Sequence, residues 1–181
     1  MSDRTRIGRF TAPADRDIVV FLLGARINTL TAVRSWAPVI AGFRRMMREL
    51  RTDPDSGLLG HLVLPRPPRL LTVVQYWESP EKLYAYAADP DQQHRPMWTD
   101  FYRRTKAAGD HIGIWHETYI VPAGFHESVY VNMPRFGLGK AIGSAPIDRR
   151  TDRAADRLRG TRPNRGQQIS PSRPGGGGRR R

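Results

Sequence analysis

The sequence predicts an α+β domain of the ferredoxin-like class, with the order β-α-β-β-α-β and an antiparallel sheet. Strand-like apolar segments and amphipathic helical segments follow one another in that order, and the first strand-like segment is apolar on both faces. Aliphatic residues nearly vanish after residue 147. A strand that is apolar on both faces must be covered on both sides. We therefore expect helices on one face of the sheet and a second copy of the chain on the other, which would make a dimeric α/β barrel.

The first half of the pattern ends at residue 77. Residues 17–26 form the first expected strand, because apolar side chains occupy both of its faces. A long helix is expected over 32–51, where apolar residues recur at alternating spacings of four and three. Two further strands are expected over 58–64 and 70–77. The proline-rich segment between them indicates a hairpin-like loop that cannot extend the strand pairing.

The second half contains a broken helix and two strands. A short helix is expected over 80–88, since Pro80 at its first position follows a serine that can serve as N-cap. A second helical segment is expected over 96–108, where a glycine then ends it. Strands over 112–121 and 128–132 complete the order.

The two ends of the chain differ in composition from the domain of residues 17–147. Residues 1–16 are polar and predict an N-terminal arm. Residues 148–181 are rich in arginine, glycine and proline and predict a disordered basic tail. This tail holds 11 Arg and 3 Asp, or +8 (11 − 3) of the net charge of +13, which leaves +5 (13 − 8) for the remainder. Such a distribution predicts a solvated tail that attracts nucleic acid only non-specifically, through phosphate contacts.

Several classes of function are excluded by composition. The chain has no cysteine, which excludes disulfides, thiolate ligands and a cysteine nucleophile, and fits a cytoplasmic protein. The five histidines are scattered without the spacing of a chelate, so no metal site is expected. The longest apolar run is too short to span a bilayer, and the first ten residues lack the apolar core of a signal peptide. We expect no membrane partner.

The strand expected over 112–121 carries the most informative side chains. His116 and Glu117 are adjacent, so they point to opposite faces and cannot jointly bind one metal ion. Trp115 and Tyr119 share the face of Glu117. The pattern does not decide which face lines a pocket. His116 could be a general base, a haem ligand, or a structural histidine bonded to a helix carbonyl. Glu117 fits a hydrogen-bonded interface carboxylate better than a catalyst.

Two other polar positions stand out. His94 and Trp98 are four residues apart and share a helix face if the helix extends back past Pro96. They would either pack against the sheet or hold a flat aromatic ligand there. Asn132 lies in a stretch rich in proline and glycine, and its amide could orient a substrate carbonyl or dioxygen, or satisfy backbone groups.

Four motifs, at residues 73–77, 85–90, 113–119 and 132–138, resemble a bacterial and fungal monooxygenase-like family named for a protein of fumagillin biosynthesis. The resemblance covers about residues 17–146. The family is similar to the antibiotic-biosynthesis monooxygenase superfamily, whose members are dimeric α/β barrels. Some members of that superfamily oxidise phenolic or enolisable polyketides without metal or flavin, and others bind haem through a histidine.

The resemblance implies a cofactor-independent monooxygenase-like enzyme that acts on a small apolar, enolisable or phenolic compound. His116 is then the expected base, with His94 as the other candidate, and Asn132 would orient the substrate. The expected substrate-binding residues are Gln75, Tyr76, Trp77, Trp98, Trp115, Glu117 and Tyr119. Two alternatives remain: a haem-binding member of the same fold, with His116 or His94 as axial ligand, and a non-catalytic dimeric module for small-molecule binding or stress.

Overall fold

The computed structural model describes residues 4–89, 99 and 110–158 of the chain. It has the ferredoxin-like order β-α-β-β-α-β, which confirms the predicted α+β class. The six elements of this core are β2 (Ile18–Ile27), α1 (Val33–Thr52), β3 (Leu58–Arg66), β4 (Leu70–Trp77), α2 (Pro80–Ala88) and β5 (Ile112–Val121). None of the helices in the described residues combines the length and hydrophobicity of a transmembrane segment.

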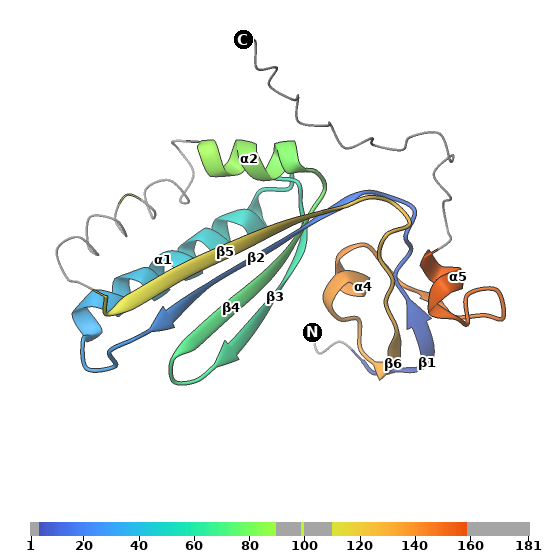
Figure 1. Cartoon of the computed structure of the whole chain (residues 1–181), viewed down its shortest axis with the longest axis horizontal. Helices are drawn as coiled ribbons and strands as arrows, with labels where there is room; N and C mark the ends of the chain where they lie inside the picture. Colours follow the sequence, from blue (N-terminus) through green and yellow to red (C-terminus); the bar gives the residue numbers. More distant parts are fainter. Residues whose placement is uncertain (1–3, 90–98, 100–109, 159–181) are drawn as a thin grey trace, which may run out of the picture.

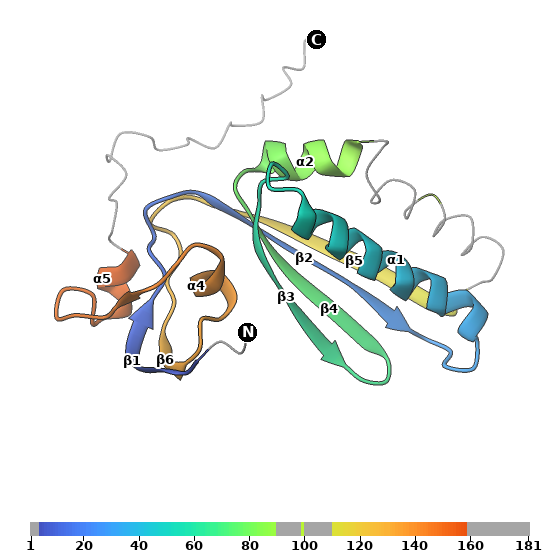
Figure 2. The same ribbon diagram turned by 180° about the vertical axis from the view of Figure 1, so that it is seen from behind.

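The core sheet is antiparallel throughout, with the strand order β3-β4-β2-β5. The central strand β2 places Leu23 opposite Val73 of β4 and opposite His116 of β5. Helices α1 and α2 lie on one face of this sheet, as Figures 1 and 2 show from the two sides. Because side chains alternate along each strand, this register decides which residues meet the helices.

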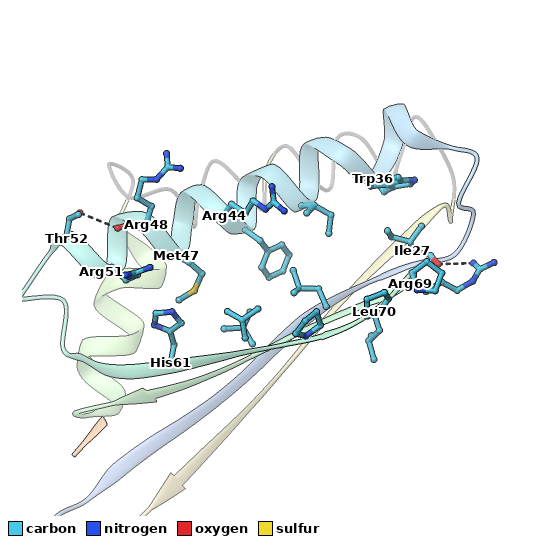
Figure 3. Close-up of a pocket in the computed structure, with 18 residues that line it drawn as sticks. Ile27, Trp36, Arg44, Met47, Arg48, Arg51, Thr52, His61, Arg69 and Leu70 are labelled. Atoms are coloured by element: carbon cyan, nitrogen blue, oxygen red, sulfur yellow. Dashed lines mark hydrogen bonds between the residues drawn. The ribbon is translucent and has the colours of Figure 1, made fainter. Parts of the chain in front are cut away.

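The main core lies between the helices and the sheet. The alternation of apolar residues in α1 places one stripe of the helix on the sheet, and Met47 points from α1 toward the strands in Figure 3. Burial of this stripe against the β2 face that bears Phe21 is the main stabilising contribution that we can assign to α1. The buried residues of this core are Val39, Phe43, Met46, Met47 and Leu50 from α1, and Val19, Phe21, Leu23 and Ala25 from β2.

A second, smaller layer covers one end of the other sheet face. It consists of the sheet β6-β1-β7 and a short helix, with the bounds β1 (Arg6–Thr11), β6 (Tyr130–Met133), β7 (Ala145–Pro146) and α4 (Gly137–Ala141). Leu138 of α4 packs in one cluster with Ile18 and Tyr76 of the core sheet. A Cβ atom at Gly60 would lie 2.8 Å from the Cβ atom of Ala141, so α4 sits close to β3.

This layer corrects the prediction that residues 1–16 form a polar arm, because β1 lies within them. The strand was missed because its apolar residues do not alternate: Gly8 and Arg9 interrupt the pattern at a register shift in the pairing with β6. The face that the sequence leaves for a second copy is therefore partly covered by the chain itself.

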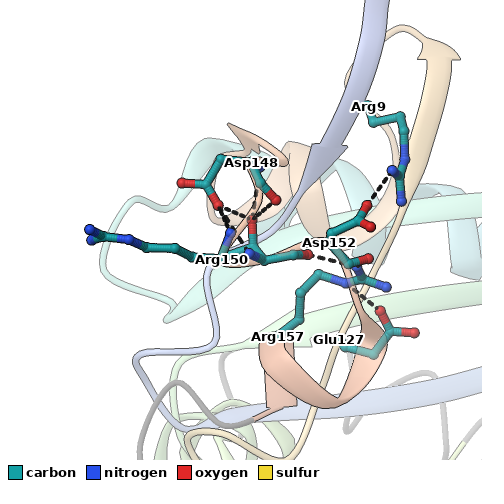
Figure 4. A network of polar contacts seen from close by, with 7 residues as sticks. Arg9, Glu127, Asp148, Arg150, Asp152 and Arg157 are labelled. Carbon is teal, nitrogen blue, oxygen red and sulfur yellow. Dashed lines mark hydrogen bonds and ion pairs between the residues drawn. The ribbon is translucent and has the colours of Figure 1, made fainter.

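The ordered domain also extends past residue 147. Helix α5 (Ala154–Leu158) is anchored by Arg157, whose Nε donates a hydrogen bond to Glu127 at 2.9 Å, and the Arg157 side chain is only 6% exposed (Figure 4). The predicted start of a disordered tail at residue 148 is thus corrected for residues 148–158. The rest of the predicted tail, residues 159–181, lies outside the described residues. The helix predicted over 96–108 also lies outside them, apart from Thr99.

Candidate functional site

Three of the sequence-predicted site residues come together on the helix side of the sheet. His116, Gln75 and Trp77 line a cavity of about 370 Å³ that α1, α2 and the sheet enclose. The predicted alternation of His116 and Glu117 is confirmed, since the register places His116 opposite Leu23 on the helix side. The His116 ring lies 5.6 Å from the ring of Phe21, between centroids, and its side chain is exposed.

Gln75 and Trp77 are bound to each other inside this cavity wall. The indole N–H of Trp77 donates to Oε1 of Gln75 at 2.9 Å, and Nε2 of Gln75 donates to the sulfur of Met47 at 3.2 Å. Both side chains are almost completely buried. The two ends of the Gln75 amide are therefore occupied, which favours a role in the wall over direct orientation of a substrate.

A phenol also lines the smaller cavity. The hydroxyl of Tyr86 donates to Glu49 at 3.3 Å. Burial raises the pKa of Tyr86 well above its ordinary value, and the Glu49 carboxylate raises it further. Tyr86 consequently stays protonated at neutral pH and acts as a hydrogen-bond donor rather than as a base.

Four predicted residues lie on the opposite sheet face, away from His116. Trp115 covers Gly24 on the neighbouring strand, where a Cβ atom would lie 2.7 Å from the indole nitrogen. The exposed Tyr119 donates its hydroxyl to Glu117 at 2.7 Å, and this hydrogen bond raises the pKa of Tyr119. Tyr76 packs under α4, and burial raises its pKa. The structure therefore assigns these residues contacts within the fold and no common pocket with His116.

Asn132 is also separate from His116. It lies in β6 with a positive φ of 50°, and its Oδ1 accepts a hydrogen bond from the backbone N–H of Gly8 at 3.0 Å. Gly8 itself has a φ of 111°. Asn132 thus supports the irregular pairing of β1 with β6, and asparagine tolerates this left-handed conformation better than most residues. His94 and Trp98 lie outside the described residues.

A larger cavity, which the sequence does not predict, lies between α1 and the β3–β4 hairpin. Its volume is about 940 Å³. Side chains of α1 such as Trp36 and Met47 border it from one side, and the strands border it from the other (Figure 3). The apolar lining consists of Ile27, Trp36, Ile40, Phe43, Met47, Val63, Pro65, Pro67, Pro68, Leu70, Leu71 and Val73. Such a volume and lining suit a small, largely apolar ligand.

His61 is the titratable base of this larger cavity. Its pairing with Gln75 across β3 and β4 puts it on the helix side of the sheet, and it points toward α1 near Met47 and Arg51 in Figure 3. Burial lowers the pKa of His61 below 6.5, and the positive charges of Arg51 and Lys140 lower it further. The imidazole is therefore neutral at neutral pH and has a nitrogen that can take a proton.

The charged part of this lining is entirely basic. The cavity is bordered by Arg44, Arg48, Arg51 and Arg69, and none of its described lining residues is acidic. Arg69 donates to the carbonyl oxygens of Ile27 and Asn28, at 3.1 and 2.7 Å. His61 and the arginines escape sequence reasoning because they come from two elements that meet only through the strand register. The one available signal is an isolated histidine on an otherwise apolar strand face.

Metal binding has no support in the part of the chain that the structure describes. There, no group of three or more His, Cys, Asp or Glu side chains is close enough to hold a metal ion. His61 and His116, the histidines of the two cavities, come from different strands and line different cavities.

Comparison with known proteins identifies the family. Residues 18–138 match the family described as Monooxygenase af470-like. The curated protein Monooxygenase af470 of Aspergillus fumigatus (strain ATCC MYA-4609 / CBS 101355 / FGSC A1100 / Af293) is 30% identical over 149 residues, which are 77% of this chain and 51% of that protein. The chain thus spans about half the length of this relative.

Solved structures show the same fold at low sequence identity. Aldoxime dehydratase (OxdRE) in complex with butyraldoxime superposes with a TM-score of 0.62 and 17% identity, over 79% of this chain and 41% of that chain. Another crystal structure of aldoxime dehydratase gives a TM-score of 0.59 and 19% identity, over 88% and 45%. These likenesses support the fold alone. The family match covers most of the chain, including α1 and the strands β3 and β4 that line the larger cavity. The protein therefore belongs to the monooxygenase af470-like family.

Proposed function

We propose that the protein is a cofactor-independent monooxygenase-like enzyme that oxidises a small apolar, enolisable or phenolic compound in the larger cavity. Family membership supports the class of reaction. The observation that carries the choice of site is His61: a histidine kept neutral by burial and by Arg51, in an apolar cavity of about 940 Å³. The base and the apolar surroundings are what this chemistry needs from a protein.

In this proposal the substrate supplies the electrons and His61 moves a proton. An imidazole nitrogen of His61 accepts the proton of the enol or phenol, and the enolate or phenolate that remains is electron-rich at carbon. Dioxygen reacts at the enolate or ring CH carbon of that anion, which is a methylene carbon in the keto tautomer, and His61 returns its proton to the peroxide that forms. One oxygen atom becomes a carbonyl oxygen of the product and the other leaves as water, so oxidation of the methylene group provides all the electrons. The apolar walls exclude water from the intermediate.

The test is oxygen uptake by chelator-treated protein with a panel of anthrones, naphthols and 1,3-diketones. We expect uptake with at least one class above the rate of spontaneous oxidation without protein, and one labelled oxygen atom from ¹⁸O₂ in the product. Compounds that bind without any protein-dependent uptake would support the non-catalytic binding module instead.

A haem-binding protein is the second candidate, and the same cavity is the reason. His61 and the carboxylate-binding Arg44 and Arg51 would hold the haem, which would supply redox chemistry when bound. Titration with haemin decides this point. A sharp Soret band that is lost in His61→Ala would favour haem binding over the cofactor-independent reaction. A spectrum equal to that of free haemin would exclude haem binding.

We propose further that the protein forms a homodimer through the sheet face opposite the helices. Leu22, Val74 and Leu62 lie there and are only half-buried, beyond the end that α4 covers. Light scattering should give about twice the chain mass of 20.5 kDa. Leu22→Lys should yield a monomer, because an unpaired buried charge costs several kcal/mol. Val33→Lys on exposed helix surface is the matched control. A wild-type mass equal to one chain would contradict the dimer.

A further inference from the structure

We propose that the larger cavity selects the ionised form of its ligand, an apolar skeleton that carries an anionic oxygen, and that the positive charges of Arg44, Arg48 and Arg51 at its border attract this oxygen. The inference rests on the proposed function in taking this cavity as the substrate site, and it adds the charge state in which the ligand binds.

The three arginines form one row along α1. Their spacings of four and three place them on one side of the helix, and all three border the cavity. Figure 3 shows Arg51 at the end of the cavity where His61 lies, with Arg44 farther along the helix toward Trp36. Arg48, between them, extends away from the strands in this view, so it adds positive charge at the border of the cavity. An oxyanion near His61 therefore meets more than one positive charge.

The guanidinium groups in this row are available to a ligand. No hydrogen bond in the described part of the chain runs from the side chain of Arg44, Arg48 or Arg51 to a protein acceptor, whereas Arg69 at the other end of the cavity is bonded to two carbonyl oxygens. A guanidinium offers several donors in a fixed plane and binds oxyanions well, and a hydrogen bond to a charged acceptor is stronger than a neutral one.

The rest of the lining determines what carries the anionic charge. The remaining lining, called the floor here, is largely apolar and includes Phe43, Leu71 and Val73. A compact polyanion such as free phosphate would leave this floor wet. An aromatic or enolic acid fills it and places one oxygen at the edge. The arginines and the floor together fit a phenolate, an enolate or an apolar carboxylate.

Preference for the anion has a consequence for the reaction. If the phenolate binds more tightly than the phenol by some factor, the acid dissociation constant of the bound phenol rises by that factor and its pKa falls, because the two equilibria are linked. The arginine row then makes the proton easier for His61 to remove. Arg51 also holds the pKa of His61 down, so one cation acts on both partners of the proton transfer.

The experiment uses 4-nitrophenol, whose ionisation changes its visible absorbance, and 4-nitroanisole, which has the same ring and cannot ionise. Both are titrated into the wild-type protein. The three arginines are exposed, so their attraction is screened, and we expect 4-nitrophenolate to bind roughly tenfold more tightly than 4-nitroanisole, with the pKa of bound 4-nitrophenol lower by about one unit. Added salt should reduce both effects.

Arg44→Gln/Arg48→Gln/Arg51→Gln should remove the preference and leave the affinity for 4-nitroanisole unchanged. Arg45→Gln is the matched control, because Arg45 is exposed on the same helix and lines neither cavity. Equal affinities of the two probes in wild type, or a preference that survives in the triple variant, would overturn the inference. Neither binding measurement needs dioxygen, so anion selectivity without oxygen uptake would reject the proposed function alone.

Discussion

His61→Asn is expected to lower the rate of oxygen-dependent turnover by ~10²–10⁴-fold, the usual effect of losing a positioned general base. Asparagine keeps a polar side chain on β3 and can still accept a hydrogen bond, but it cannot take a proton. His61 is only half-buried, so the fold should survive the change. Initial rates of oxygen uptake and the melting temperature, measured on the same preparation, separate a lost base from a lost fold.

The pH dependence of the wild-type rate provides a second readout of His61. Because burial, Arg51 and Lys140 all lower the pKa of His61 from 6.5, the neutral base persists below that pH. The acid side of the rate profile should therefore fall at a pH below 6.5, and it should be absent in the residual activity of His61→Asn.

Stability should respond to the same titration with a defined sign. The folded state holds His61 neutral where the unfolded chain, with an ordinary pKa of 6.5, begins to bind a proton. The unfolded state therefore binds more protons as the pH falls below 6.5, and stability is lost from that pH down through the folded pKa. His61→Asn should lose less stability over this window, which thermal unfolding at a series of pH values would detect.

His116→Asn is the companion variant, because His116 is the base expected from the sequence and lines the smaller cavity. A loss of turnover that follows His116 and spares His61→Asn would place the reaction in the smaller cavity. Equal rates in wild type and His61→Asn would contradict the role of His61. The two variants therefore decide between the two cavities without knowledge of the natural substrate.

The sequence predicts the core fold well, because its elements carry either a periodic signal or, as at the start of α2, a capping signal. Helix α1 follows from its stripe of apolar residues, and the opposite orientations of His116 and Glu117 follow from strand geometry. The small sheet does not follow, because Gly8 breaks the alternation in β1. Arg157 is missed for a related reason: a segment rich in charges predicts solvation, and its ion pair with Glu127 comes from a distant loop.

The candidate site is less predictable than the fold. The aromatic motifs predict that Trp115 and Tyr119 bind substrate, but both residues lie on the sheet face away from both cavities. The larger cavity depends on how α1 and the β3–β4 hairpin meet, and no local pattern contains that information. His61 has no motif around it. Its environment arises from burial and from the charges of Arg51 on α1 and Lys140 on α4, which only the packing of these helices brings near it.

Gly24→Ala is expected to lower the free energy of unfolding by about 3 kcal/mol or more. This loss is at or above the upper end of the usual cost of overpacking. The new Cβ atom would collide with the backbone oxygen of Leu71 on β4 and lie 2.7 Å from the indole nitrogen of Trp115 on β5. The Leu71 oxygen belongs to a strand paired with β2, so it can move only if the sheet pairing is disturbed. Urea unfolding measures the change in the free energy of unfolding.

Gly113→Ala is the matched control for this substitution. Gly113 lies on the adjacent strand β5, and among the described residues a Cβ atom there would meet only Asn28, at an ordinary contact distance of 4.0 Å. This variant should stay within ~1 kcal/mol of wild type, since a change without steric conflict has a small effect.

The Trp115→Ala background separates the two contacts at Gly24: it removes the indole but keeps the Leu71 oxygen, so the cost of Gly24→Ala should shrink without vanishing. Wild-type stability in Gly24→Ala would contradict both close contacts. An unchanged cost of Gly24→Ala in the Trp115→Ala background would mean that Trp115 moves aside freely, which would reopen its sequence-predicted role in substrate binding.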